Sequence, residues 1–263
     1  MKVKRISEEE AYIQQKRYVT IDELCEKFDV SMSTMRRDLD ILTQKGKIIK
    51  NYGGISSAQQ GEDVGRLPFN QRGALMLKEK KRIAKAAAVL IHDGDYIFID
   101  SGSTVCHLVD YIKDRRVTIL TNNLDFIIRA LPYPNLQIIV FSGILNRDYY
   151  SFTSVDDGNA EILKSFNFTK AFMAATGITV QYGIMNSLLT DNRLKVAAVE
   201  RAQEVYLLAD HTKFGRVTIK SYGKIGQMSA IITDQPAPPD IGQCAREEGC
   251  RIIIADEGKE LDT

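Results

Sequence analysis

Residues 31 to 37 combine hydroxyl side chains with two adjacent arginines, a set suited to binding nucleic acid. Arginine neutralises DNA phosphates, and arginine and hydroxyl side chains both hydrogen-bond to base edges in the major groove. Two lysines and a tyrosine follow shortly afterwards. The sequence therefore predicts DNA contacts by Ser31, Ser33, Thr34, Arg36, Arg37, Lys47, Lys50 and Tyr52.

A second set of polar residues, DSGST at positions 100 to 104, has the composition of an anion site. Gly102 lets the backbone approach an anion, and the neighbouring hydroxyls can donate to it. An ordinary strand-to-helix turn capped by serine and threonine has the same composition, so this loop alone leaves both interpretations open. Other polar loops after apolar runs favour binding. The predicted contacts are Asp100, Ser101, Gly102, Ser103, Thr104, Thr121, Asn122, Asn123, Gly143, Gly177, Lys195 and Lys213.

Two short helices joined by a tight corner would position the first set. Thr20 followed by Glu23 predicts a capping box that begins a helix ending at Phe28. Asp29 and Val30 leave room only for a corner before Ser31, which is typical of a second N-cap. An earlier helix is expected to begin near Ser7 and to pack Ala11 and Ile13 inward.

The second helix of this pair has one apolar face, formed by Met35, Leu39 and Leu42 at helical spacing. Its arginines therefore lie on the opposite side, as in a helix that enters the major groove. Gly46 is expected to end it, and the run KIIKNYGGIS predicts a basic hairpin, or wing. The alternative is a packing module in which Asp38 and Asp40 neutralise the arginines.

The rest of the chain alternates apolar runs with helical segments. The runs YIFID, VTILT, LQIIVF, KAFMAAT, EVYLLAD and SAIITD predict a mostly parallel sheet covered on both faces. Ligands of such α/β folds bind at the carboxyl ends of the strands, where the polar loops of this chain occur. A final run, CRIIIA, is expected to be structural or to pair with another copy.

Length and composition fit two domains. The 263 residues are 44% hydrophobic with a formal net charge of only +1, so the basic character is local. We predict a winged helix-turn-helix domain at 1–57, a linker at 58–72 and an α/β domain at 73–263. The four cysteines lack metal spacing, and the N-terminus lacks an apolar secretory core. A soluble cytoplasmic protein without metal or membrane contact is expected.

The motifs that carry these features resemble the DeoR family of bacterial transcriptional regulators. VSMSTMRRDLDIL with the following GK and YGG resembles the family's DNA-binding domain, from which the chain departs at Tyr52 and Ile55. FIDSGST, LTNNL, FSGIL, AATGI and LLADHTKFG resemble its sensor domain, so nearly the whole chain is covered. The resemblance implies a sensor that is similar to sugar-phosphate isomerases and binds a phosphorylated sugar or related metabolite.

An enzyme of that isomerase type would need a carboxylate base and a glycine-rich support for developing charge. The stretch 182–203 offers Asp191 and Glu200 without a glycine cluster. We therefore predict no catalytic residue, no metal ligand and no cofactor. Asp191 is expected to cap a helix, and His107 and His211 to be ordinary polar residues.

The combined prediction is a sequence-specific transcriptional regulator, expected to repress a carbohydrate-metabolism operon and to respond to a phosphorylated sugar. It would bind double-stranded operator DNA as a homo-oligomer, a dimer or a tetramer, because one head contacts too few bases for adequate specificity. The alternatives are a sugar-phosphate isomerase-like enzyme with a vestigial DNA-binding head, a nonspecific nucleoid-type binder and an activator.

Overall fold

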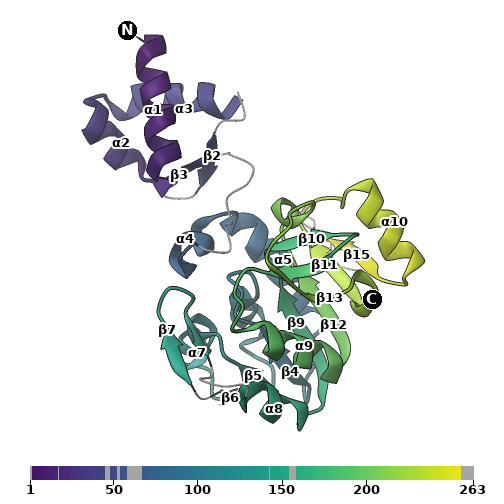
Figure 1. The fold of residues 1–263 in the computed structure, drawn as a ribbon. Coiled ribbons are helices and arrows are strands. Elements are labelled where there is room, and N and C mark those ends of the chain that lie inside the picture. The colour runs from purple at the N-terminus through teal and green to yellow at the C-terminus, as the bar shows by residue number, and fades with distance from the viewer. Residues whose placement is uncertain are drawn as a thin grey trace. The chain divides into compact units, whose positions relative to one another are not determined.

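The chain divides into two units of very different size in the computed structural model (Figure 1). The N-terminal unit comprises Met1–Glu62 with Gly73–Leu77, and the C-terminal unit comprises Asp63–Arg72 with Lys78–Thr263. The structure describes residues 2–16, 18–44, 48–51, 54–57, 67–141, 143–153 and 158–255.

The N-terminal unit is a winged helix-turn-helix, as predicted. Three helices precede a β-hairpin, and a short strand after the first helix joins the hairpin in an antiparallel sheet of order β1-β3-β2. In chain order the elements are α1 (Lys2–Lys16), β1 (Tyr18–Val19), α2 (Ile21–Phe28), α3 (Met32–Gln44), β2 (Ile48–Asn51) and β3 (Gly54–Ser57).

Side-chain caps define the corner between α2 and α3. The Oγ1 of Thr20 accepts a hydrogen bond from the amide of Glu23 at 3.1 Å, which confirms the first half of the expected capping box. The Glu23 carboxylate accepts from the Tyr12 hydroxyl at 2.9 Å, so it ties α2 to α1. Asp29 ends α2 in the left-handed conformation, and Ser31 Oγ accepts from the Thr34 amide at 3.3 Å.

The core of this unit contains the residues that the helical spacing predicted. Met35, Leu39 and Leu42 of α3 are fully buried together with Ile13 and Leu24. The first helix begins at Lys2 rather than near Ser7, and Ala11 is exposed, so that part of the prediction was wrong. Polar residues throughout α1 obscured both its start and its inner face.

Seven parallel strands form the sheet of the C-terminal unit, in the order β15-β14-β12-β9-β4-β5-β6. Every apolar run that the sequence marked is one of these strands, which confirms the α/β fold. The bounds are β4 (Tyr96–Ile99), β5 (Val117–Thr121), β6 (Leu136–Val140), β9 (Phe168–Ala174), β12 (Ala202–Leu208), β14 (Ala230–Thr233) and β15 (Arg251–Ile254).

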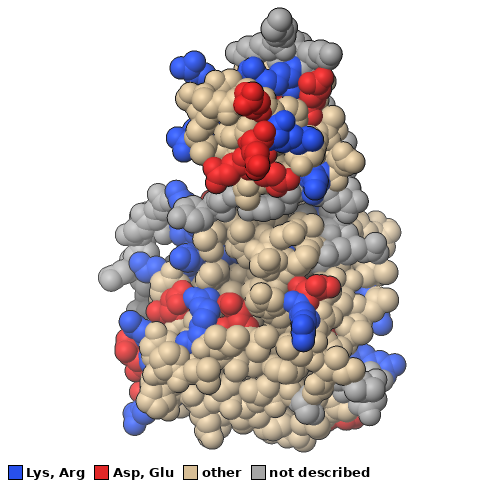
Figure 2. All heavy atoms as spheres, turned by 90° about the vertical axis from the view of Figure 1, so that its left-hand side faces the viewer, with Lys and Arg blue, Asp and Glu red and all other residues tan. Residues whose placement is uncertain are grey.

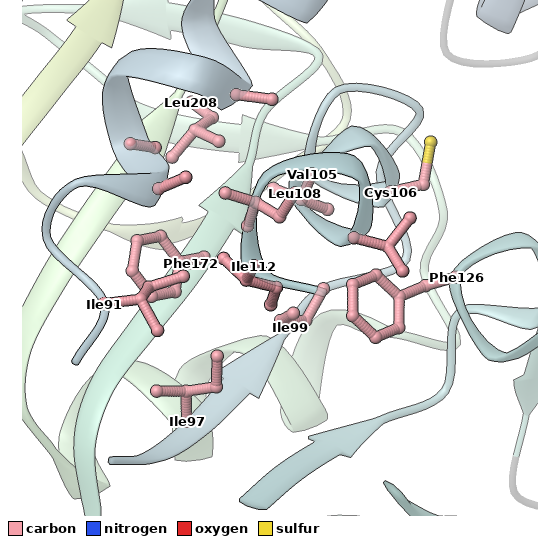
Figure 3. Close-up of a cluster of buried hydrophobic side chains, with 14 of the residues drawn as sticks. Ile91, Ile97, Ile99, Val105, Cys106, Leu108, Ile112, Phe126, Phe172 and Leu208 are labelled. Atoms are coloured by element: carbon pink, nitrogen blue, oxygen red, sulfur yellow. The ribbon is translucent and has the colours of Figure 1, made fainter. Parts of the chain in front are cut away.

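Helices cover both faces of this sheet because successive strand residues point to opposite sides. Ile97 and Ile99 of β4 pack with α5 (Leu77–Ala88), α6 (Val109–Ile112) and α7 (Leu124–Ala130). Figure 3 shows this layer of side chains. Phe98 faces the other layer, which includes α8 (Gly158–Lys164), α9 (Asn192–Arg201) and α10 (Pro239–Glu247).

Two small antiparallel sheets accompany the parallel sheet, and the sequence did not predict them. One is the hairpin β7 (Ile144–Asn146) with β8 (Ser151–Thr153), and the other is the sheet β10-β11-β13 (Gly177–Thr179, Gly183–Asn186, Lys220–Gly223). The hairpin contacts the loop after β5, because the Phe152 amide donates to the Asn122 carbonyl at 3.0 Å. A short helix, α4 (Phe69–Ala74), precedes α5, and 3-10 turns span Val105–Leu108 (η2), His211–Lys213 (η3) and Ile225–Gln227 (η4).

Among the described residues, no helix combines the length and the apolar character that crossing a lipid bilayer would require.

Candidate functional site

The loops that follow β12, β9, β4 and β5 share one edge of the sheet, because these neighbouring strands run parallel. Along the chain, β4 is followed outward by β5 and β6, whereas β9, β12, β14 and β15 extend the sheet in the other direction. The strand order therefore reverses between β4 and β9. Ligands of open α/β sheets bind at this kind of switch point.

Asp100, directly after β4, joins three segments at this point. One carboxylate oxygen accepts the Ser101 amide at 2.8 Å, and the other accepts the Ala174 amide at 2.9 Å. Lys195 on α9 forms a buried ion pair with the same carboxylate. The side chain of Asp100 therefore holds the end of β9, its own loop and α9 together.

Asp191 lies close to this ion pair and has a different role from the expected one. It stands at the N-cap position of α9, but its side chain makes no cap and instead accepts from Ser101 Oγ at 3.0 Å. Burial and the nearby charge of Asp100 raise the pKa of Asp191 to about 6, against the opposing charge of Lys195. The carboxyl of Asp191 is therefore easier to protonate than that of an exposed aspartate.

Lys195 also lies over the ring of Tyr222, with 5.1 Å between Nζ and the ring centroid. The hydroxyl of Tyr222 donates to the Ala174 carbonyl at 2.8 Å. This buried tyrosine, on β13, was missed because the sequence predicted no strand there.

Thr121 and Asn123, after β5, bind the protein's own backbone. Thr121 Oγ1 donates to the Ile99 carbonyl at 2.7 Å. Asn123 Nδ2 donates to the carbonyls of Asp100 and Gly102, at 3.0 and 3.2 Å, and its Oδ1 caps α7 by accepting from Phe126. These residues fix the loop 100–104. Asn122 is buried beside them, and its Oδ1 has no hydrogen-bond partner among the described residues.

Lys80, near the start of α5, is the principal residue that the sequence did not single out. Its Nζ donates to Ser103 Oγ at 3.1 Å and also to the Arg72 carbonyl. Burial, with the charges of Lys213 and Arg72, lowers the pKa of Lys80 to about 7. Lys80 lies in the amphipathic run LMLKEKKRIAKAAAVLI, and nothing in that pattern separates it from the exposed Lys81.

Asp210 and Lys213, after β12, complete the charged group. Lys213 Nζ lies 3.2 Å from the buried Asp210 carboxylate, and Thr212 donates its amide to that carboxylate at 3.1 Å. Burial opposes ionisation, but the charges of Lys213 and Lys80 prevail and lower the pKa of Asp210 to about 2. Asp210 is therefore a carboxylate at neutral pH.

The charges of this group do not cancel when all of its members are ionised. Four cations face three carboxylates, which leaves one positive charge at the edge of the sheet. Burial also lowers the pKa of Arg72, which feels the charges of Asp100 and Asp191. The members are Arg72, Lys80, Lys195 and Lys213 with Asp100, Asp191 and Asp210. A buried group with excess positive charge suits an anionic ligand.

The three predicted glycines have separate environments. A Cβ on Gly102 would lie 2.2 Å from the Cβ of Ala174, so packing alone requires glycine there. A Cβ on Gly177 would lie 2.3 Å from the Arg216 carbonyl oxygen, which is also a packing requirement. Gly143 is exposed with φ of 151°, and its neighbour Ser142 lies outside the described residues.

The buried histidine of this region is neutral. Burial and the charge of Arg129 lower the pKa of His107 to about 4. Ser103 and Thr104 are buried in the loop that precedes it. His211 is held differently, because its Nδ1 lies 2.7 Å from the Asp234 carboxylate.

In the N-terminal unit, the predicted DNA contacts on α3 are available to a ligand. Arg36, Arg37 and Ser33 are exposed, and Asp38 is buried in an ion pair with Arg5 of α1 rather than with either arginine. Figure 2 shows basic and acidic side chains interspersed on one face of this unit. Lys47 and Tyr52 lie outside the described residues, and Lys50 is described only as part of the backbone of β2.

Asn123→Asp tests whether the loop 100–104 depends on the hydrogen bonds that the Asn123 side chain donates to it. The variant keeps the oxygen that caps α7 but replaces the donor to the Asp100 and Gly102 carbonyls with a repelling oxygen. We expect the free energy of unfolding to fall by about 2 kcal/mol, the cost of buried acceptors without a donor. Urea unfolding beside Asn123→Ser, which keeps a cap and introduces no charge, measures the difference. Equal stability of Asn123→Asp and the native protein would show that these hydrogen bonds do not stabilise the loop.

Comparison with known proteins identifies the family. The DeoR-like helix-turn-helix model matches residues 5–61, and the DeoR C-terminal sensor domain model matches residues 76–235. The chain is 41% identical to the HTH-type transcriptional regulator IolR of Bacillus subtilis over 97% of this chain and 100% of that protein. It is 30% identical to the glycerol-3-phosphate regulon repressor of Escherichia coli over 92% and 94% of the two chains.

Among solved structures, ribose 5-phosphate isomerase A of Methanocaldococcus jannaschii is similar with a TM-score of 0.38 and 18% identity, over 53% of this chain and 55% of that chain. The matches to both domain models and to full-length regulators agree with the architecture of the two units. The chain belongs to the DeoR family of transcriptional regulators.

Proposed function

We propose that this regulator is a cytoplasmic repressor of a carbohydrate-metabolism operon and that a phosphorylated sugar, bound at the edge of the parallel sheet, controls its affinity for operator DNA. The observation that carries the proposal is the group of four cations and three carboxylates at the switch point of the sheet, which has one excess positive charge when all of its members are ionised. The name of one relative, the glycerol-3-phosphate regulon repressor, supports a phosphorylated ligand.

Lys80 and Ser103 are the proposed contacts of the phosphate group. Lys80 is buried with a lowered pKa, so its charge is poorly compensated in the free protein. An anion beside Ser103 would supply the missing negative charge and favour the protonated amine. Lys213, whose charge also acts on Lys80, would contribute to the same attraction.

The same lysine suggests how the ligand acts on the rest of the chain. Lys80 donates to the backbone carbonyl of Arg72, which lies on α4, a helix that overlaps the end of the predicted linker 58–72. α4 also contacts the turn between β7 and β8, where Phe69 stacks on Tyr150 with 5.1 Å between the ring centroids. That region also bonds to the loop after β5. Two of the proposed ligand loops are therefore linked to α4, the loop 100–104 through Lys80 and the loop after β5 through the β7–β8 hairpin.

On the DNA side, we propose that α3 is the recognition helix. Arg36, Arg37, Ser33 and Thr34 would contact phosphates and base edges, and the wing would follow the backbone with Lys47, Lys50 and Tyr52. The exposure of both arginines and the engagement of Asp38 by Arg5 support this assignment.

We further propose that the protein assembles as a homo-oligomer. Large apolar side chains are exposed around α7 and β7, among them Leu131 at 76% and Ile144 at 63%. Figure 2 shows a broad surface of the C-terminal unit without charged side chains. Exposed apolar area of this kind is characteristic of protein interfaces, and paired heads would read a repeated half-site.

Catalysis is not part of the proposal. The carboxylate of Asp191 accepts from Ser101, and that of Asp100 is held by Lys195 and two backbone amides. Both acids therefore serve the protein's own structure. The relatives quoted above are named as a transcriptional regulator and a repressor.

A mobility-shift titration on the protein's own upstream region, repeated with a panel of phosphorylated sugars, tests the proposal. We expect selective binding to that fragment over random DNA, and a change in affinity of at least about fivefold with one sugar phosphate but not with its unphosphorylated sugar. Sedimentation of the same sample measures the stoichiometry. Equal affinity for random DNA would refute sequence-specific regulation. If no phosphorylated sugar of the panel changed the affinity for DNA, control by such a ligand would be refuted.

Arg37→Ala tests the recognition helix. Because each neutralised phosphate releases counterions, we expect weaker binding to all DNA sequences and a salt slope reduced by about 1. Lys113→Ala, an exposed lysine of the C-terminal unit, is the control for a loss of charge alone. An unchanged slope in Arg37→Ala would remove this arginine from the phosphate contacts.

Lys80→Met tests the phosphate site through pH. Anion binding favours protonated Lys80, so the affinity of the native protein for the sugar phosphate should fall as the pH rises above about 7, by at most about tenfold per pH unit. The decline should be absent in Lys80→Met and present in Lys81→Met, which removes an exposed neighbour. Calorimetry in buffers of different ionisation enthalpy measures the proton uptake. The same decline in Lys80→Met would assign it to another group.

A further inference from the structure

A buried carboxylate in the N-terminal unit has no complete set of partners. Glu9 on α1 is fully buried, and neither of its carboxylate oxygens accepts a hydrogen bond from the described residues. The nearest cation is Arg5, one turn earlier on α1, whose Nε lies 3.4 Å from Oε1. An acid in this environment is costly to ionise, so its position calls for a physical explanation.

The same guanidinium serves a second buried acid. Arg5 Nε donates to Oδ2 of Asp38 at 2.9 Å, and Nη2 contacts the same oxygen. Asp38 is 1% exposed and follows Arg37 directly in α3. One arginine of α1 is therefore shared between an acid of its own helix and an acid of the helix that carries the proposed DNA contacts.

This arrangement fixes geometry more than it adds stability. The attraction within a buried ion pair offsets little more than the free energy lost on removing the two charges from water. A planar guanidinium, however, forms good hydrogen bonds with its partners in only a few orientations. The apolar contacts of Met35, Leu39 and Leu42 hold α3 against the core without comparable directionality. Because Asp38 adjoins Arg37, an axial shift of α3 would move the proposed contacts with it.

We propose that Arg5 is a positioning residue for DNA binding: its guanidinium, shared between Glu9 and Asp38, sets the register of α3 against α1. The proposal rests on the proposed function of α3 as the recognition helix. Arg5 does not need to touch DNA, because it acts through Asp38 on the position of Arg36 and Arg37.

Because Glu9 can ionise, a positioning role of Arg5 predicts that DNA affinity depends on pH. Apolar packing of α3 against α1 would give no such dependence. Burial, followed by the charge of Asp38, raises the pKa of Glu9 to about 7, against the opposing charge of Arg5. Among the described residues, Glu9 also acts on Cys25 of α2, whose own pKa is raised by burial, by Asp22 and by Glu9, against the opposing charge of Arg36. The described core side chains of β1 and β3, Val19 and Ile55, carry no charge.

Ionised Glu9 competes with Asp38 for the guanidinium, so the hold on α3 weakens as the pH rises. The stability of the folded protein changes with pH in the same direction. A carboxyl whose folded-state pKa is raised binds its proton more tightly in the folded state, so the free energy of unfolding falls as the pH rises from the ordinary value of 4.5 to about 7. Both effects vanish when Glu9 cannot ionise.

The first experiment compares operator affinity at about pH 6 and about pH 8, on either side of the raised pKa. We expect the native protein to bind at least about fivefold more weakly at the higher pH, and Glu9→Gln to lose most of this difference. Glu8→Gln removes the same charge from an exposed position on the same helix and should retain it. Equal pH profiles for Glu9→Gln and the native protein would refute the role of Glu9.

The second experiment separates positioning from folding. Arg5→Met alone leaves two buried acids without a cation and is expected to unfold the N-terminal unit. The triple variant Arg5→Met, Glu9→Gln, Asp38→Asn has similar volumes and no buried charge, so it should fold with native helix content by circular dichroism. We expect its operator affinity at about pH 6 to be at least about fivefold lower than that of the native protein, and to show none of the pH dependence that Glu9 gives the native protein.

Native affinity in the folded triple variant would overturn the proposal while leaving the regulator intact. Failure of the native protein to select its promoter would instead refute the proposed function itself. Restored affinity on returning Arg5 and Asp38 to the triple variant, with Glu9→Gln kept, is the expected rescue. Absence of that rescue would also count against the positioning role.

Discussion

The C-terminal unit depends on a single carboxylate, that of Asp100. It receives two backbone amides and the ammonium group of Lys195, and so it joins the ends of β4 and β9 to α9. These are the two strands between which the order of the sheet reverses. The carboxylate therefore connects the segments that leave the sheet at this switch point, and it orients the loop that carries Ser101 and Ser103.

The sequence predicted the elements well wherever local chemistry determines them. Alternation of apolar runs and helices marked every strand of the main sheet, and Thr20 and Ser31 marked the helix corner by their capping hydroxyls. It predicted that the loop 100–104 and residues 121–123 lie at the same end of the sheet, but it expected Asn123 to contact a ligand and did not predict the hydrogen bonds that its side chain donates to the loop. Their neighbourhood follows from the parallel direction of the strands, which the sequence pattern already implies.

What the sequence could not indicate were roles set by distant partners. Lys80 is one of several lysines in an amphipathic run, and only the fold shows that it alone is buried against Ser103. Asp191 has the sequence context of a helix cap, yet its carboxylate bonds to a serine ninety residues away along the chain. Arg5 and Glu9 lie in a strongly charged N-terminal helix, where neither periodicity nor composition distinguishes buried charges from exposed ones.

The contact between Gly102 and Ala174 limits how this end of the sheet can change. The missing side chain of Gly102 leaves the space that the Ala174 methyl group occupies. Because a Cβ at position 102 would lie only 2.2 Å from that methyl group, neither position accepts a larger residue without displacing the other. Relatives that diverge here would have to alter both positions together. A redesign of the loops at this end of the sheet should therefore conserve this pair and alter the hairpin and the α9 loop instead.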